Sequence, residues 1–126
     1  MHARKIISTL FAGSVILAVG HHLLISKGWY YQYPHVDMPM HLLGGFVGAL
    51  AAYAVIVTVV DVSVSAEKSL VGIMLAVLVI VIGWEVFEHI WGITEDAGLS
   101  LDTMSDMLFG LVGGLVGWCA VTAIRL

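Results

Sequence analysis

The chain has 126 residues, of which 60% are hydrophobic and 11% are charged, and its mean hydropathy is +1.03. About a quarter of the residues of a soluble domain are charged, so this composition excludes a water-exposed surface and with it a soluble enzyme. The chain contains five Lys and Arg residues, too few for the basic patch that nucleic acids require, which excludes a nucleic-acid partner. The composition therefore predicts an integral membrane protein.

Four apolar stretches are long enough to cross a hydrocarbon core of about 30 Å, which takes roughly 20 residues of helix. They cover residues 6–25, 40–60, 70–91 and 103–124. Only short polar segments separate them, so little chain remains for a second domain. We therefore expect an all-α fold in which residues 1–126 form a single transmembrane domain, a four-helix bundle.

Basic residues are distributed unevenly between the two ends of the predicted spans. Four of them fall on one side of the membrane: Arg4, Lys5, Lys68 and Arg125. Lys27 alone falls on the other side. Lys and Arg concentrate on the cytoplasmic side, so we expect both termini in the cytoplasm. An aromatic run that suits an interfacial belt then lies on the outer side: Trp29, Tyr30, Tyr31 and Tyr33.

The sequence repeats a pattern at a constant offset of 65 positions. The segments 37–48 and 102–113 share Asp, Leu, Gly, Val and Gly at corresponding places. This repeat predicts two tandem helical hairpins related by a pseudo-twofold axis along the membrane normal. Glycines four positions apart allow helices to approach closely, and they occur as Gly44/Gly48, Gly110/Gly114 and Gly113/Gly117. We expect them either to make the second and fourth spans the central pair or to form a face for a homo-oligomer or a partner membrane protein.

Ionisable side chains gather at the outer end of all four predicted spans. They are His21 and His22 on the first span, Asp37 and His41 on the second, Glu85, Glu88 and His89 on the third, and Asp102 and Asp106 on the fourth. The cytoplasmic halves of the spans carry no carboxylate or imidazole. Ionisable groups within a span are costly and usually face the bundle interior or a wet cavity, so this end of the bundle is the candidate functional site.

The spacing of these residues indicates metal binding. The pairs Asp37/His41, Glu85/His89 and Asp102/Asp106 are each four positions apart, so each pair projects from one helical face. Carboxylates and imidazoles on facing helices build the metal sites of bundles, and these ligands suit Zn, Mn or Fe. The candidate ligands are Asp37, His41, Glu85, Glu88, His89, Asp102 and Asp106. The candidate catalytic residues among them are Glu85, Glu88 and Asp106.

Several of these residues also have a structural interpretation. Asp37 and Asp102 stand where a helix is expected to begin, and Asp is a favoured N-cap, so capping and ligation both remain open for them. Asp106 lies one turn inside its predicted helix and cannot cap it. His21 and His22 are adjacent and point in different directions, so we expect at most one of them in the site.

Three short motifs resemble the VanZ-like group of small membrane proteins and the YjdF-type inner-membrane proteins. They are Asp37-x-x-x-His41 on the second span, Trp84-Glu85-x-x-Glu88 on the third, and Asp102-Thr-x-x-Asp106 with Gly110 and Gly113 on the fourth. The resemblance covers about residues 37–114. It implies a multi-pass protein of the bacterial inner membrane and, for VanZ itself, glycopeptide-antibiotic resistance, but it implies no particular reaction.

These features predict a divalent-metal site that acts on a membrane lipid or a lipid-linked substrate at the outer interface. The metal would activate water or polarise a phosphoryl or carbonyl oxygen, and a nearby carboxylate would act as general base. Three other interpretations remain open. They are a cation or proton pathway, haem binding through two histidines, and a non-catalytic subunit or assembly factor whose polar cluster only holds the helices together.

Overall fold

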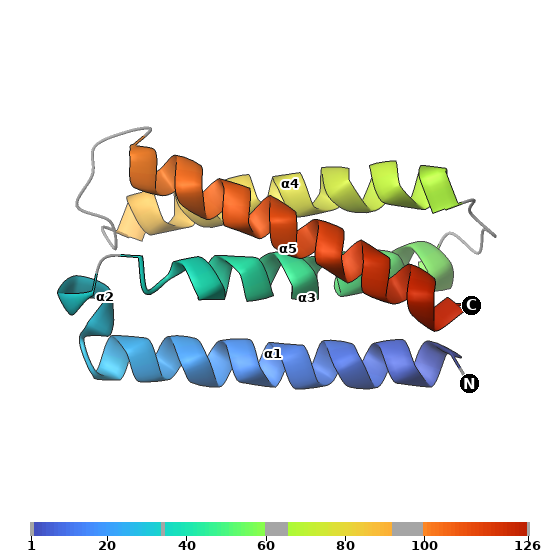
Figure 1. The fold of residues 1–126 in the computed structure, drawn as a ribbon, viewed down its shortest axis with the longest axis horizontal. Coiled ribbons are helices and arrows are strands. Elements are labelled where there is room, and N and C mark those ends of the chain that lie inside the picture. The colour runs from blue at the N-terminus through green and yellow to red at the C-terminus, as the bar shows by residue number, and fades with distance from the viewer. Residues whose placement is uncertain (1, 34, 60–65, 92–99, 126) are drawn as a thin grey trace.

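A computed structural model of the chain describes residues 2–33, 35–59, 66–91 and 100–125 (Figure 1). Five helices follow one another in it: α1 (His2–Ser26), α2 (Trp29–Gln32), α3 (Met38–Val59), α4 (Ala66–Trp91) and α5 (Leu101–Arg125). None of these described residues lies in a strand. The prediction of an all-α fold is confirmed for them.

Four of the helices are long and apolar enough to cross a membrane, over Arg4–Ser26, Met38–Thr58, Ser69–Trp91 and Leu101–Ile124. These ranges agree with the four predicted spans to within a few residues. The single-turn helix α2 was not predicted, and it follows Gly28, whose left-handed φ of 65° turns the chain back after α1. Two of the polar segments that separate the predicted spans, residues 61–69 and 94–102, fall partly outside the described residues. Residues 66–69 and 101–102, which are described, already belong to α4 and α5.

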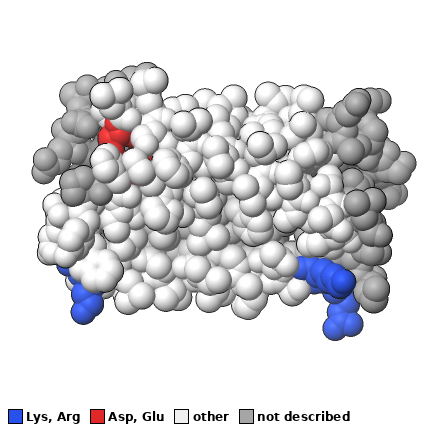
Figure 2. Space-filling model, in the orientation of Figure 1, with Lys and Arg blue, Asp and Glu red and all other residues white. Residues whose placement is uncertain are grey.

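The surface of the bundle is apolar along most of its length. Large apolar side chains such as Phe11 on α1, Val79 on α4 and Leu108 on α5 are exposed. In Figure 2, the Lys, Arg, Asp and Glu side chains that are visible lie towards the two ends of the molecule, and the middle of that face is uncharged. Such a surface is unfavourable in water, whereas lipid tails solvate it. The exposed residues are therefore the lipid-facing surface of a membrane protein.

Helices α3 and α5 form the central pair, which is one of the two arrangements that the glycine spacing left open, because they make the most extensive contact in the bundle. Helix α4 packs against both of them, whereas α1 packs mainly against α3. The backbones of α1 and α4 do not approach each other in the described ranges, and the two helices meet there through the rings of His21 and Trp84. Figure 1 shows α1 alongside α3 at the edge of the bundle and α5 crossing the others obliquely. The fully buried core, which includes Leu50, Ile73, Val77 and Val121, thus lies between α3, α4 and α5.

Glycines set the close approach of α3 and α5. A Cβ atom added at Gly45 would overlap the carbonyl oxygen of Gly110, and one added at Gly113 would overlap the carbonyl oxygen of Leu42. Gly110 also faces α4, where an added Cβ would lie 2.6 Å from the side chain of Val81. Only glycine allows backbones to come this close. These positions pack helices within one chain, and the homo-oligomer interpretation stays a prediction.

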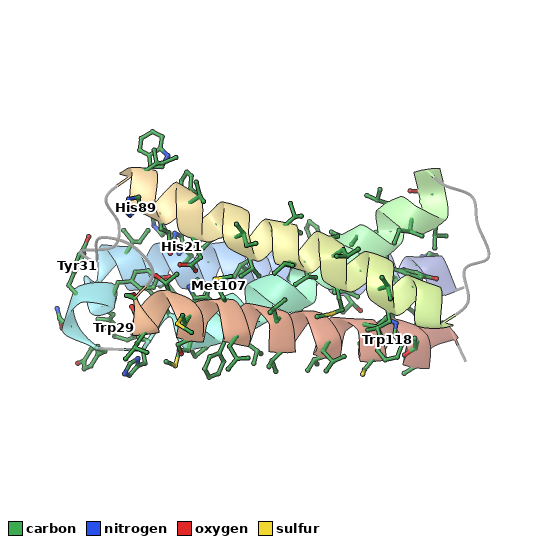
Figure 3. The ribbon with its side chains drawn as sticks, turned by 90° about the horizontal axis from the view of Figure 1, so that it is seen from above. His21, Trp29, Tyr31, His89, Met107 and Trp118 are labelled. Carbon is green, nitrogen blue, oxygen red and sulfur yellow. The ribbon has the colours of Figure 1, made fainter. Side chains whose placement is uncertain are left out.

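Both ends of the chain lie at one end of the bundle, so α2 and the beginnings of α3 and α5 lie at the other end (Figure 1). His21, Trp29, Tyr31 and His89 gather at this second end in Figure 3, whereas Trp118 lies near the first. The histidine and aromatic residues of the outer predicted cluster therefore share one end of the molecule.

Candidate metal centre

His41 stands at the centre of the polar cluster. It lies one turn inside α3, and both nitrogens of its imidazole face carboxylates from other helices. Nδ1 is 3.9 Å from Oε1 of Glu85 on α4, and Nε2 is 3.7 Å from Oδ2 of Asp106 on α5. The side chains of His41, Glu85 and Asp106 are only 8%, 10% and 5% exposed. Three spans thus bring ionisable groups to one buried point.

Two sets of potential ligands share this imidazole. Asp37, His41 and Asp106 form the first set, and His41, Glu85 and Glu88 form the second. Within each set the ligand atoms lie within 4.8 Å of one another. The structure therefore brings together five of the seven residues that the sequence proposed as metal ligands.

Three carboxylate oxygens of this cluster are buried without a hydrogen-bond partner among the described residues: Oδ1 of Asp37, Oε1 of Glu85 and Oδ1 of Asp106. Leaving such an atom unpaired costs about 1–3 kcal/mol, and more when the group is charged. The 3.7 Å between Nε2 of His41 and Oδ2 of Asp106 is too long for a hydrogen bond, but two metal–ligand bonds of about 2.0–2.2 Å each can span it. A bound cation would satisfy the cluster.

Asp37 immediately precedes α3. Its backbone carbonyl accepts hydrogen bonds from the amides of Met40 and His41, at 2.7 and 3.0 Å. The Oδ1 atom makes no hydrogen bond and so does not cap the helix. This oxygen remains available as a ligand next to the ring of His41.

The other two predicted ligands, His89 and Asp102, belong to neither set. His89 is exposed near the end of α4. Asp102 lies in the first turn of α5, where its Oδ1 is 3.7 Å from Nδ1 of the exposed His35. Capping of α5 falls to Ser100, whose Oγ accepts the backbone N–H of Thr103 at 3.1 Å. Asp102 therefore pairs at the surface, and the hydroxyl of Ser100 takes the role of N-cap that the sequence left open for Asp102.

A cavity of about 410 Å³ lies beside the cluster. Its polar end is lined by Asp37, His41 and Glu88, together with His21 of α1 and Tyr30 of α2. Most of the other lining residues are apolar and come from α1, α3 and α4. Ligand pockets typically enclose about 300–1,000 Å³, so the space suits a small molecule or part of a larger one.

Tyr30 and His21 close the polar end of the cavity. The Tyr30 hydroxyl lies 2.7 Å from Nδ1 of His21, whose ring packs edge-on against Trp84 with 5.8 Å between the ring centroids. Burial, together with the nearby carboxylates of Asp37 and Glu88, raises the pKa of Tyr30 to about 12. Tyr30 is therefore protonated at neutral pH and can donate its proton to the hydrogen bond with His21.

Sequence reasoning missed the role of Tyr30, which was expected in an interfacial belt. The signal for it was Gly28, because a glycine directly after a span favours a turn that returns the next residues to the bundle. For the two adjacent histidines, the structure agrees with the expectation that at most one joins the site. His21 lines the cavity, whereas His22 is exposed.

Comparison of the sequence with models of known protein families gives a match over nearly the whole chain. A family model described as "Predicted membrane protein (DUF2238)" matches residues 4–126. The chain belongs to the DUF2238 family. The match includes all four spans of this DUF2238 protein and every residue of the cluster around His41. No curated protein and no solved structure matches the chain.

Proposed function

We propose that this DUF2238 protein binds a divalent metal ion, Zn, Mn or Fe, around His41 and uses it on a lipid or lipid-linked substrate. The observation that carries this proposal is the set of three buried, unpaired carboxylate oxygens beside one imidazole. Polar groups that only hold helices together are normally paired with hydrogen-bond donors. Oxygen atoms without donors, next to a histidine nitrogen, are instead what a metal ion requires.

The two sides of the His41 ring suggest different roles. A metal-binding histidine usually donates its second ring N–H to a carboxylate, which fixes the orientation of the ring. Glu85 on the Nδ1 side suits that orienting role, and Asp106 with Asp37 on the Nε2 side suits ligation. Glu88 is close to the same ring and lines the cavity, so it is the carboxylate best placed to act on a bound substrate.

The chemistry follows from these roles. A bound divalent ion lowers the pKa of coordinated water or polarises a substrate oxygen. Glu88 then serves as the general base that takes a proton at the cavity side of the site. Asp37 and Asp106 hold the ion, and their negative charge is offset by it. The apolar part of the cavity supports a substrate with a hydrocarbon portion.

Elemental analysis of the detergent-purified protein tests the proposal. We expect a near-stoichiometric content of Zn, Mn or Fe, and we expect His41→Ala to lower metal affinity at least 100-fold. The reason is that the substitution removes the residue that both ligand sets share, and loss of an outer-sphere partner alone typically costs about 10–100-fold.

His89→Ala is the matched control, because His89 is an exposed histidine at the same end of the bundle and outside both ligand sets. This variant is expected to retain the metal. A metal-free wild-type protein, or an equal loss of metal in the two variants, would contradict the proposal.

We also infer a location and an orientation. The VanZ-like and YjdF-type motifs support a location in the bacterial inner membrane. The concentration of Lys and Arg on the side of the predicted spans that holds the two chain termini supports cytoplasmic termini. The cluster around His41 then faces away from the cytoplasm. A reporter enzyme that works only in the cytoplasm is expected to be active when fused after residue 126 and inactive when fused after Lys27. The opposite pattern would overturn this orientation.

Two contacts support the inferred duplication of a helical hairpin. His41 faces Asp106 and Gly45 faces Gly110, and the members of each pair are separated by the 65-position offset of the sequence repeat. A twofold axis between α3 and α5 would bring equivalent positions together in this way. We therefore propose α1–α3 and α4–α5 as the repeated hairpins. An experimental structure in which the two hairpins do not superpose would contradict this.

A further inference from the structure

The cavity beside the metal centre lies between α1 and α4, two helices that meet through the rings of His21 and Trp84. Ser14, Leu17 and Ala18 of α1 line one side of it, and Ile80 and Trp84 of α4 line the other. The backbones of α1 and α4 do not approach each other in the described ranges, and the cavity is only partly enclosed. Its open side faces the surrounding medium. Within the hydrocarbon region of a bilayer that medium is lipid chains.

Helix α3 forms the floor of this cavity through Gly44 and Gly48. A Cβ atom at Gly48 would lie 3.2 Å from the side chain of Ile80, whereas no atom lies within 4 Å of a Cβ placed at Gly44. Gly44 is nevertheless half-buried. The open space that it faces is therefore the cavity. A larger side chain at this position would extend into the cavity without moving any neighbouring protein atom.

We propose that this cavity binds a single hydrocarbon chain of a lipid whose uncharged, oxygen-bearing head group lies at the metal centre. The placement of the head group rests on the function proposed above, whereas the binding of the chain does not. The apolar walls and the open side suit a hydrocarbon chain, and the volume of about 410 Å³ lies near the lower limit for ligand pockets. The polar end, where Asp37 and His41 line the same cavity, provides the site for the head group.

The charges at the polar end argue for an uncharged head group. Asp37 and Glu88 line the cavity, and Glu85 and Asp106 lie directly behind them. No Lys or Arg lines the cavity in the described part of the chain. Sites that bind phosphate normally surround it with cationic side chains, and here the charge of one divalent ion is already offset by its carboxylate ligands. A hydroxyl, ester or amide oxygen can bind such an ion without this electrostatic repulsion.

A photoactivatable long-chain alcohol in phosphatidylcholine vesicles tests the proposal. Labelling of the reconstituted protein is expected to saturate and to map by mass spectrometry to peptides of α1 and α4 that line the cavity. Gly44→Leu is expected to reduce the saturable labelling at least 10-fold, because its side chain fills the space that the hydrocarbon chain occupies. Equal labelling of this variant and the wild-type protein would overturn the proposal.

Gly83→Leu provides the matched control. Gly83 is also a glycine of a membrane span with no atom within 4 Å of an added Cβ, but it is exposed and does not line the cavity. Labelling of this variant is expected to equal that of the wild-type protein. The metal content of Gly44→Leu, expected to be unchanged, reports whether the bundle remains folded, and Gly44→Ala gives a smaller change at the same place.

Competition experiments address the head group separately. Unlabelled long-chain alcohol is expected to suppress labelling at least 10-fold more effectively than an alkyl phosphate of the same length, and equal competition would overturn the choice of an uncharged head. Saturable labelling that persists in His41→Ala while the wild-type protein holds no metal would contradict the metal proposal and leave the chain-binding site supported. Normal metal content in a wild-type protein that shows no saturable labelling would contradict the chain-binding site and leave the metal proposal supported.

Discussion

Gly113→Ala is expected to lower the free energy of unfolding by about 2 kcal/mol or more, while Gly83→Ala is expected to raise it by up to about 1 kcal/mol. Both substitutions replace glycine by the best helix former within a membrane span. At Gly113 the added Cβ overlaps the backbone carbonyl of Leu42, which cannot rotate away, so α3 and α5 must separate. At Gly83 the Cβ meets no atom within 4 Å, and only the gain in helix propensity remains.

Equilibrium unfolding in mixed detergent micelles measures this difference in sign. Gly45→Ala is a second variant with the same expected effect, because its Cβ overlaps the carbonyl of Gly110. A similar change in stability for Gly113→Ala and Gly83→Ala would show that the close approach of α3 and α5 contributes nothing.

The same glycine contact also sets the geometry of the site. Gly45 lies one helical turn from His41 on α3, and Gly110 lies one turn from Asp106 on α5. Residues four apart share a helix face, so the close approach of Gly45 and Gly110 holds His41 and Asp106 within 3.7 Å of each other. Separation of the two helices by Gly45→Ala should therefore weaken metal binding as well as the fold.

Removal of metal by a chelator is expected to destabilise the wild-type protein by about 2.7 kcal/mol when the free metal was previously at 100 times its Kd. The physical reason is that the proposed ion would bind only the folded arrangement, in which α3, α4 and α5 place the candidate ligands around His41. The change is measured as the difference between unfolding curves recorded with metal and with chelator.

His41→Ala is expected to unfold identically in the two conditions, whereas His89→Ala is expected to keep the full difference. If the cluster only held the helices together, chelation would leave the wild-type curve unchanged. The two interpretations thus predict opposite results from the same experiments.

The four spans and the polar end of the bundle were predictable from local features of the sequence. Each span is an uninterrupted apolar stretch of the length that the bilayer requires, and tertiary contacts cannot change that requirement. The depth of the ionisable residues followed in the same way, since Asp37 and His41 stand at the start of one span and Glu85 and Glu88 near the end of another. The glycine spacing also indicated the pairing of α3 with α5.

Which of the ionisable residues contact His41 was not predictable from the sequence. Glu85 and His89 are four positions apart, as are Asp102 and Asp106, yet only Glu85 and Asp106 of these pairs contact His41. Spacing shows that two side chains share a face of their own helix, but it does not show how that helix is rotated towards its neighbours. In an apolar bundle every face is hydrophobic, so the sequence gives no clear signal for that rotation.

Local sequence was sufficient to predict four helices able to cross a membrane, with the carboxylates and imidazoles of the spans at one end. These properties depend on composition along each helix and on the thickness of the bilayer. The packed bundle was needed to show that His41 is central, that Tyr30 and His21 line the polar end of the cavity, and that the backbones of α1 and α4 stay apart. The distances and rotations between helices are set by close contacts such as Gly45 with Gly110, which exist only once the whole bundle is packed.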